Sequence, residues 1–349
     1  MSRLEAELSL ERLEEPGREE RIEDIVLGFA NSRVLVIGDL ILDEYREGDV
    51  ERVSPEAPVP IVRVSGSAAC LGGAANVARA IVSLGASCQL VGLVGDDAEG
   101  ETLLSLVEEL GMSTAGILRA DDRPTTHKLR IVARSQQMLR LDREENGEIA
   151  PRISAIFRRL ILERIEGCDL VILEDYDKGM FGDGLARWVI ELARSLNILV
   201  VADPKVDLAR FRGVDLVKPN FEEAVQFAPD CGSDPLMRQN LLEKLQFDLG
   251  GGEVVVTRGR FGMSAMDRHG SHFDVPTRAL EVYDVQGAGD TSIAVLGLCR
   301  AAGRSLRDAC IVANAAAGIA VEKTGTAAVG QSELRKRLSE ILVLREGEP

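Results

Sequence analysis

The residues from Asp284 to Thr291, Asp-Val-Gln-Gly-Ala-Gly-Asp-Thr, combine a glycine-rich turn with a carboxylate. The residues that follow have helical spacing, so the turn predicts the start of a helix. Such a start presents unpaired N–H groups and a partial positive charge, and the glycine cradle (Gly287, Ala288 and Gly289) leaves room for an anion. Asp290, in the first turn, would accept the proton of a hydroxyl that attacks a bound phosphoryl group. A glycine turn followed by an ordinary Asp cap is the competing interpretation.

Small and acidic residues follow the first apolar runs, at the end of a strand where ligands bind in open α/β sheets. Asp39 and Asp43 come after the first run, and their carboxylates would accept hydrogen bonds from sugar hydroxyls. Gly72 and Gly73 would let a ligand approach the backbone, and Asn76 offers both a donor and an acceptor to a polyol. Turn formation and tight helix packing explain the same residues without a ligand.

Charged residues also follow the later apolar runs, in Glu174–Gly179, Asp203–Lys205, Lys218–Glu223 and Thr257–Gly259. Their basic members, Lys178, Lys205, Lys218 and Arg258, would supply local positive charge to an otherwise acidic chain. Asn220 with Glu223 would order water on Mg²⁺. Any one of these stretches is equally well explained as a turn.

An alternating segment, residues 125–142, carries basic residues. Lys128, Arg130 and Arg134 are predicted to share one face of a strand, with Arg140 further along. That face would meet a second anionic group on the substrate. The alternative is an edge strand that its charges protect from aggregation.

The composition excludes several classes of protein. The 349 residues carry a net charge of −16, which argues against nucleic-acid binding and makes a phosphate-handling site dependent on a divalent cation. The six scattered cysteines predict reduced, buried thiols, and His269 and His272 predict an exposed hairpin rather than a metal site. We expect a cytoplasmic protein, because no apolar run is long enough to span a membrane and the N-terminus is not signal-like.

Apolar runs alternate with helical patterns along the chain, which predicts an α/β fold with a mostly parallel sheet covered on both faces. Residues 1–31 are predicted as a charged leader with a docking helix around Ile22, Ile25, Val26 and Phe29, and residues 32–349 as one domain. Residues 45–64 and 123–142 interrupt the alternation and predict a small β-lid over the ligand end. The expected strands are 34–37, 88–94, 170–173, 198–202, 216–217 and 254–257, and the expected helices are 74–84, 101–110, 153–165, 184–196 and 237–247.

Residues 32 to 329 resemble the ribokinase-like (PfkB) family of carbohydrate kinases. The motifs that carry the resemblance are Gly72-Gly73 before Asn76, Asn220-x-x-Glu223, and Gly287-Ala288-Gly289-Asp290. The resemblance implies an αβα sandwich with a β-lid that builds a homodimer, and an enzyme that uses ATP and Mg²⁺, with K⁺ as an open possibility. It implies that Asp290 is the base, that the glycine cradle is the anion hole, and that Asn314 lines the adenine pocket.

Within the family, the segment Ser54–Pro60, with Val36–Asp43, Thr126–Arg130 and Gln136–Asp142, resembles the kinases of D-glycero-β-D-manno-heptose 7-phosphate. This implies phosphorylation of the anomeric hydroxyl to the 1,7-bisphosphate, in the synthesis of ADP-heptose and lipopolysaccharide core precursors. If so, a nucleotidylyltransferase is expected on another polypeptide, because the sequence ends at Pro349. The alternatives are a kinase for another sugar, sugar phosphate or nucleoside, and a silent binding regulator.

Two residues depart from the family pattern: Gln286, where Thr is more usual, and Glu174, where the heptose subgroup has Ser. Both touch the expected sites. The predicted sugar side comprises Asp39, Asp43, Gly72, Gly73, Asn76, Lys128, Arg130, Arg134, Arg140, Asp175 and Lys178. The predicted nucleotide side comprises Lys205, Asn220, Glu223 (which would hold Mg²⁺ through water), Thr257, Arg258, Gly259 and Asn314.

Overall fold

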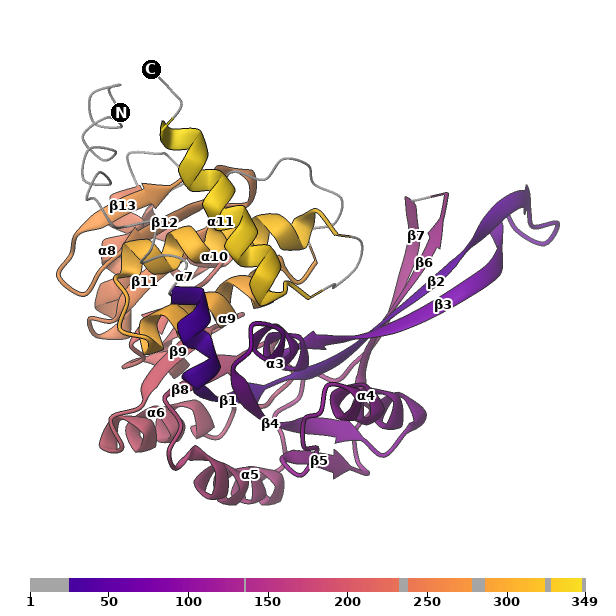
Figure 1. Ribbon diagram of the computed structural model, residues 1–349. Helices are drawn as coiled ribbons and strands as arrows, with labels where there is room; N and C mark the ends of the chain where they lie inside the picture. The colour runs from indigo at the N-terminus through magenta and orange to yellow at the C-terminus, as the bar shows by residue number, and fades with distance from the viewer. Residues whose placement is uncertain (1–24, 135, 232–237, 278–285, 324–327, 347–349) are drawn as a thin grey trace.

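A nine-stranded sheet forms the centre of the protein (Figure 1). The computed structural model describes residues 25–134, 136–231, 238–277, 286–323 and 328–346. The predicted strands are confirmed, and the sheet is parallel apart from a hairpin at one edge, which contains His272. In spatial order the strands are β13 (His272–Val275), β12 (Met263–Met266), β11 (Glu253–Thr257), β10 (Leu216–Val217), β9 (Leu199–Asp203), β8 (Leu170–Glu174), β1 (Arg33–Gly38), β4 (Ser87–Gly95) and β5 (Ile117–Ala120).

Helices cover both faces of this sheet, because successive residues of a strand point to opposite sides. In β1, Val34 and Val36 join one hydrophobic cluster, whereas Leu35 and Ile37 join the other. The first cluster lies under α3 (Ala74–Ser83), α4 (Ala98–Glu109), α9 (Ala288–Ala301), α10 (Leu306–Val321) and α11 (Gln331–Glu346). The second lies under α5 (Pro151–Ile165), α6 (Leu185–Ser195), α7 (Phe221–Phe227) and α8 (Arg238–Leu249). Short 3-10 turns are η1 (Phe29–Asn31), η2 (Leu208–Phe211), η3 (Pro229–Cys231) and η5 (Gly259–Phe261).

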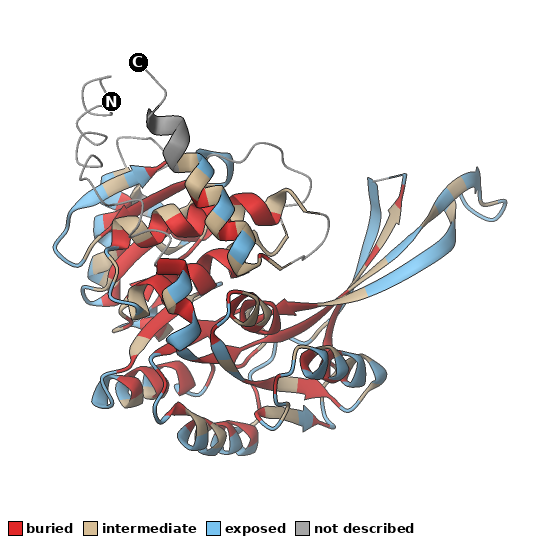
Figure 2. Cartoon of the chain, viewed as in Figure 1, coloured by how far each residue is buried: buried red, intermediate tan, exposed pale blue. Residues whose placement is uncertain are grey.

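The lid is a separate four-stranded sheet in the order β3-β2-β6-β7. Its strands are β2 (Leu40–Val53), β3 (Pro60–Gly73), β6 (Thr126–Ala133) and β7 (Gln136–Arg143), so it extends closer to the core than predicted. Figure 1 shows the strands projecting from the body, and Figure 2 shows that their outer parts are exposed. Because β2 starts two residues after β1 ends, the lid is anchored at the carboxyl end of the central sheet.

The docking segment of the leader lies partly in the described residues. Ile25, Val26 and Phe29 are buried in the first hydrophobic cluster, as predicted, whereas Ile22 lies outside the described residues. The cysteines form no disulfide, but only Cys168, Cys299 and Cys310 are buried, because the others lie near strand and loop surfaces. Across the described ranges, none of the helices is long and apolar enough to cross a membrane.

Candidate active site

Asp290 lies in the first turn of α9 and is almost completely buried. The chain enters this helix through Gly287, whose φ of 72° lies in the left-handed region that favours glycine. Asp284 and Val285, the first residues of the motif, lie outside the described residues. The motif therefore forms the predicted helix start, with the carboxylate beside the glycine cradle.

Two side chains hold the Asp290 carboxylate from opposite sides. The phenol of Tyr176, in the loop after β8, donates to Oδ1 at 2.8 Å, and Nδ2 of Asn76, on α3, donates to Oδ2 at 2.5 Å. Burial raises the pKa of Asp290, and these two hydrogen bonds oppose the rise. A carboxylate with a raised pKa is a stronger base than an exposed Asp, which suits the predicted proton acceptor.

A cavity of about 1340 Å³ opens beside Asp290, at the carboxyl ends of the sheet strands. Ala288 and Gly289 line it at the start of α9, so the glycine cradle faces open space. A side chain at Gly289 would begin 3.7 Å from Nζ of Lys218, which places a cation next to the cradle. The cavity is large enough for a nucleotide and presents the donors and the charge that an anion needs.

Lys218 belongs to a buried charged cluster at the ends of β8, β9 and β10. Its Nζ lies 2.6 Å from Oδ2 of Asp203, and burial, partly offset by this lysine, raises the pKa of Asp203 to about 7. Glu174 is in register with Asp203, and its Oε2 has no hydrogen-bond partner among the described residues. Burial raises the pKa of Glu174 well above its usual value. The departure from the family pattern at Glu174 thus adds a second acid to the cluster.

Asn220 and Glu223 form a capping box that starts α7. Oδ1 of Asn220 accepts from the Glu223 amide at 2.9 Å, and Oε2 of Glu223 accepts from the Asn220 amide at 2.8 Å. Nζ of Lys205 lies 2.6 Å from Oε1 of Glu223. No cluster of three potential metal ligands occurs in the ranges that the structure describes. Glu223 lines the cavity, so its carboxylate is placed where it could hold Mg²⁺ through water, and this role stays a prediction.

The remaining residues predicted for the nucleotide side all line the same cavity: Lys205, Thr257, Arg258, Gly259 and Asn314. Arg258 also pairs with Asp274 at 3.4 Å, and Nδ2 of Asn314 donates to the Pro276 carbonyl at 2.7 Å. These contacts hold the loops around the cavity. The structure therefore brings together residues that are separated by more than a hundred positions in the sequence.

The predicted sugar side centres on Asp43, in the lid strand β2. Nη1 of Arg130 lies 2.5 Å from Oδ1 of Asp43, and both residues are buried. A Cβ at position 72 would lie 2.2 Å from Oδ2 of Asp43, so any larger residue there would displace the Asp43 carboxylate. Gly73, with φ 55°, then turns the chain into α3, which carries Asn76. Asp43, Gly72, Gly73 and Asn76 thus lie at one corner between the lid and the core.

The basic residues of the lid are paired with acids of the same protein. Nζ of Lys128 lies 3.3 Å from Asp142 and 3.1 Å from Glu144, and Arg140 contacts Asp142 at 2.8 Å.

The prediction that Arg134 shares the face of Lys128 and Arg130 is wrong. Strand β6 ends at Ala133, and Arg134 has a φ of 50° in the following turn, where it donates to the Val50 carbonyl.

Asp39 holds the loop after β8 through its carboxylate, and its predicted contact with sugar stays a prediction. Its Oδ2 accepts from the amides of Tyr176 at 2.8 Å and Lys178 at 3.1 Å. Burial raises the pKa of Asp39 to about 6. Asp175 accepts from the Lys205 amide at 3.3 Å, and Lys178 donates to Asn146 at 2.7 Å.

Sequence reasoning missed three residues of the site: Tyr176, Arg79 and Tyr45. Tyr176 lies inside the predicted stretch Glu174–Gly179, but no pattern indicated that its phenol reaches Asp290. Arg79 donates to Asn76 at 2.5 Å from the next turn of α3. The phenol of Tyr45, in the lid, donates to Oε1 of Gln286, the residue before the glycine cradle. Gln286 thus connects the lid to the start of α9.

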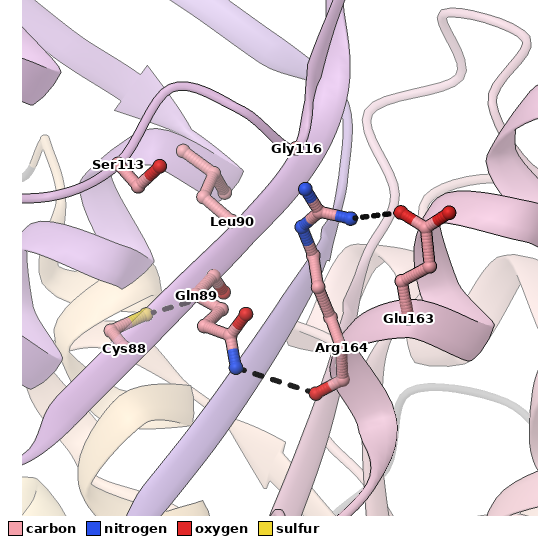
Figure 3. A pocket seen from close by; sticks show the side chains of 7 residues that line it. All are labelled: Cys88, Gln89, Leu90, Ser113, Gly116, Glu163 and Arg164. Carbon is pink, nitrogen blue, oxygen red and sulfur yellow. Dashed lines mark hydrogen bonds and ion pairs between the residues drawn. The ribbon is translucent and has the colours of Figure 1, made fainter.

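A second hollow, of about 270 Å³, lies at the opposite end of the sheet (Figure 3). Cys88, Gln89, Ser113 and Arg164 are among its lining residues, and the Gln89 amide donates to the Arg164 carbonyl at 3.4 Å. It lies at the amino ends of the strands, and its volume is far smaller than that of the cavity at Asp290. Parallel sheets bind ligands at the other end, so this hollow is not the candidate active site.

Solved structures share this fold at low sequence identity. Phosphofructokinase-2 from Escherichia coli in complex with potassium aligns with a TM-score of 0.75 at 20% identity, over 89% of this chain and 99% of the other. The ribokinase of Arabidopsis thaliana complexed with ribose and ATP aligns with a TM-score of 0.68 at 19% identity, over 88% of this chain and 98% of the other. These similarities show that the chain has the ribokinase-like fold.

The chain belongs to the pfkB family of carbohydrate kinases, because the model of that family matches residues 31–333. It is therefore a phosphotransferase with an alcohol group as acceptor. Similar curated proteins include the bifunctional protein HldE of Desulfatibacillum aliphaticivorans, 39% identical over 313 residues, which cover 89% of this chain and 64% of that protein. The bifunctional protein HldE of Shewanella sp. (strain W3-18-1) is 41% identical over 328 residues, which cover 92% of this chain and 65% of that protein. The chain therefore spans slightly less than two thirds of the length of these relatives.

Proposed function

We propose that this chain transfers the γ-phosphoryl group of ATP to the anomeric hydroxyl of D-glycero-β-D-manno-heptose 7-phosphate, giving the 1,7-bisphosphate and ADP. The observation that carries the proposal is the Asp290 carboxylate, fixed by two donors beside the glycine cradle and the 1340 Å³ cavity. The choice of heptose rests on the resemblance of Ser54–Pro60 and on the relatives named HldE. The reaction would belong to the cytoplasmic synthesis of ADP-heptose, a precursor of lipopolysaccharide core.

In the proposed reaction, the sugar lies between Asp43 and Asn76, and ATP fills the large cavity. The hydroxyl oxygen forms a bond to Pγ while the bond from Pγ to the bridging oxygen of ADP breaks, and the hydroxyl proton passes to Asp290. The N–H groups of the glycine cradle and the ammonium of Lys218 stabilise the charge on the transferring group. Mg²⁺, held through water at Glu223, would neutralise the phosphates of ATP.

The lid would exclude water, which otherwise competes with the sugar for the phosphoryl group. Tyr45 supports this role, because its contact with Gln286 ties the lid to the start of α9. The lid would also join two chains into a homodimer, because Leu139 and Leu141 expose 52% and 51% of their surface on the face opposite Arg130 and Arg140.

Replacement of Asp290 by Asn tests the proposed chemistry. The variant keeps the shape of the side chain but cannot accept the proton, so we expect ADP formation with heptose 7-phosphate to fall by at least about a hundredfold. Asp121→Asn, at an exposed site, is the matched control. Near-normal turnover of the Asp290 variant would rule out the assigned base.

A second candidate is a kinase for an unphosphorylated sugar or a different sugar phosphate. The internal pairing of Lys128, Arg130 and Arg140 favours it, because it leaves less free positive charge for a substrate phosphate. Heptose 7-phosphate, fructose 6-phosphate, ribose and adenosine can be compared by kcat/KM in one coupled assay. A preference for ribose or adenosine would overturn the heptose assignment and leave the kinase class intact.

A further inference from the structure

A chain of three side chains ends at the proposed catalytic base. Nη2 of Arg79 donates to Oδ1 of Asn76 at 2.5 Å, and Nδ2 of Asn76 donates to Oδ2 of Asp290 at 2.5 Å. Arg79 and Asn76 lie three residues apart on α3, so their side chains occupy the same face of that helix. Helix α9 supplies Asp290 from the other side. The hydrogen bonds therefore connect Arg79 to the base through the amide of Asn76.

The guanidinium fixes which way this amide faces. An arginine side chain has donors and no acceptor, so the carbonyl oxygen of the amide must face Arg79. Its NH₂ group must then face Asp290, where it favours the ionised carboxylate. Without Arg79, the amide of Asn76 is free to rotate and to present its oxygen to Asp290, which would repel the charge needed for proton acceptance.

The described surroundings of Arg79 do not include an ion pair that would explain its position by stability alone. Among the described residues, no carboxylate lies within ion-pair distance of its guanidinium, and its Nε is buried without a hydrogen-bond partner. Burial lowers its pKa, while the nearby Cys70, Asp290 and Asp43 favour the charged form. A half-buried cation in this state costs stability, so its position is not explained by an ion pair that supports the fold.

We propose that Arg79 is a positioning residue, which holds the amide of Asn76 in the orientation that keeps Asp290 ready to accept a proton. This rests on the proposed function of Asp290 as the base. Asp290 is also faced by Tyr176 and Glu174 at the end of β8, by Asp203 and Lys218 at the ends of β9 and β10, and by Asp43 from the lid. These groups remain in place when Arg79 is changed.

The test compares Arg79→Met with Arg79→Lys in the full chain, with heptose 7-phosphate and ATP as substrates. Arg79→Met should lower kcat at pH 7 by roughly tenfold, the size expected for one hydrogen bond to a charged group. It should move the acid limb of the kcat profile to higher pH and leave the KM for ATP unchanged, and Arg79→Lys should restore part of the rate. Arg187→Met, an exposed arginine of α6, is the control and should behave as wild type.

The Asn76→Ala background separates this role from others. If Arg79 acts through Asn76, Arg79→Met should cause little further loss there. A higher KM for the sugar with an unchanged pH profile would mean that Arg79 binds substrate, and a lower melting temperature with a wild-type profile would mean that it is structural; either result overturns the inference. If Asp290→Asn is active, the proposed function fails; if it is inactive while Arg79→Met is normal, only this inference fails.

Discussion

The phenol of Tyr176 and the carboxylate of Asp290 are joined by a hydrogen bond of 2.8 Å, although the residues lie 114 positions apart. The position of the tyrosine is fixed through its backbone, because the Tyr176 amide donates to the buried Asp39 at 2.8 Å. Its phenol contacts Oδ1 of Asp290, while Asn76 contacts Oδ2. The base is therefore held between the loop after β8 and helix α3, and the two hydrogen bonds fix the orientation of its carboxylate.

Removal of the phenol oxygen should weaken the base at low pH. The Tyr176 hydrogen bond lowers the pKa of Asp290, so Tyr176→Phe should raise that pKa and shift the acid limb of kcat to higher pH. The difference in kcat between the two proteins should become smaller as the pH rises. The measurement is kcat from pH 5 to pH 9 at saturating substrates. An unchanged acid limb would contradict this role of Tyr176.

Lys218 should be critical for stability as well as for rate. It is 2% exposed and neutralises Asp203, so Lys218→Met leaves that carboxylate buried without its cation and should lower the free energy of unfolding by about 3–5 kcal/mol. The double variant Lys218→Met/Asp203→Asn should recover much of that loss but remain slow in phosphoryl transfer. Urea denaturation and turnover are measured for both. Equal instability of the single and double variants would contradict the explanation.

Asp39 should make stability depend on pH. Its pKa is raised by burial from 3.8 to about 6 in the folded protein, so folding favours its protonated form. Its contribution is fully present below about pH 3.8 and is lost as pH rises through about 6, a loss of roughly 3 kcal/mol at 1.36 kcal/mol per pKa unit. Asn still accepts from the amides of Tyr176 and Lys178, so Asp39→Asn should remove this slope without unfolding the protein.

Urea denaturation at pH 4.5, 5.5, 6.5 and 7.5 measures the slope. Asp121→Asn is the control, because the Asp121 side chain is 86% exposed and should leave the slope as in wild type. If Asp39→Asn and wild type lose stability equally between pH 4.5 and 6.5, another group must titrate in that range.

The sequence predicts the sheet because buried parallel strands consist of short apolar runs, such as Val34–Ile37 and Leu170–Leu173. In the helices between them, apolar residues recur with a period of 3.6 residues. The helix at α11 was not predicted, although Leu334, Leu338 and Ile341 are spaced to pack on one face. Its many charged residues obscured that signal. The charged composition of the leader did not conceal Ile25, Val26 and Phe29, whose burial was predicted.

The site is less predictable, because its contacts depend on how distant elements meet. The motif around Asp290 indicates a base and an anion cradle, but which side chains hold the base is decided by the packing of α3 and the β8 loop against α9. Arg130 illustrates the limit. The alternation in β6 predicts its face, but only the pairing of β6 with β2 shows that Asp43 neutralises it.

The exposed apolar face of the lid should form the dimer interface. In β7, Leu139 and Leu141 point to one side, and the pairing with β6 places Ile131 and Leu129 beside them. Burial of this face between two lids is favourable, because isolated proteins rarely expose a contiguous apolar surface. Leu139→Glu/Leu141→Glu should therefore convert a dimer into a monomer in light scattering at micromolar concentration, with the melting temperature of the body little changed. Phe247→Glu, at a residue of α8 that is 75% exposed, is the control and should leave the mass unchanged. A monomeric wild-type protein, or a double variant that stays dimeric, would show that the lid does not join two chains.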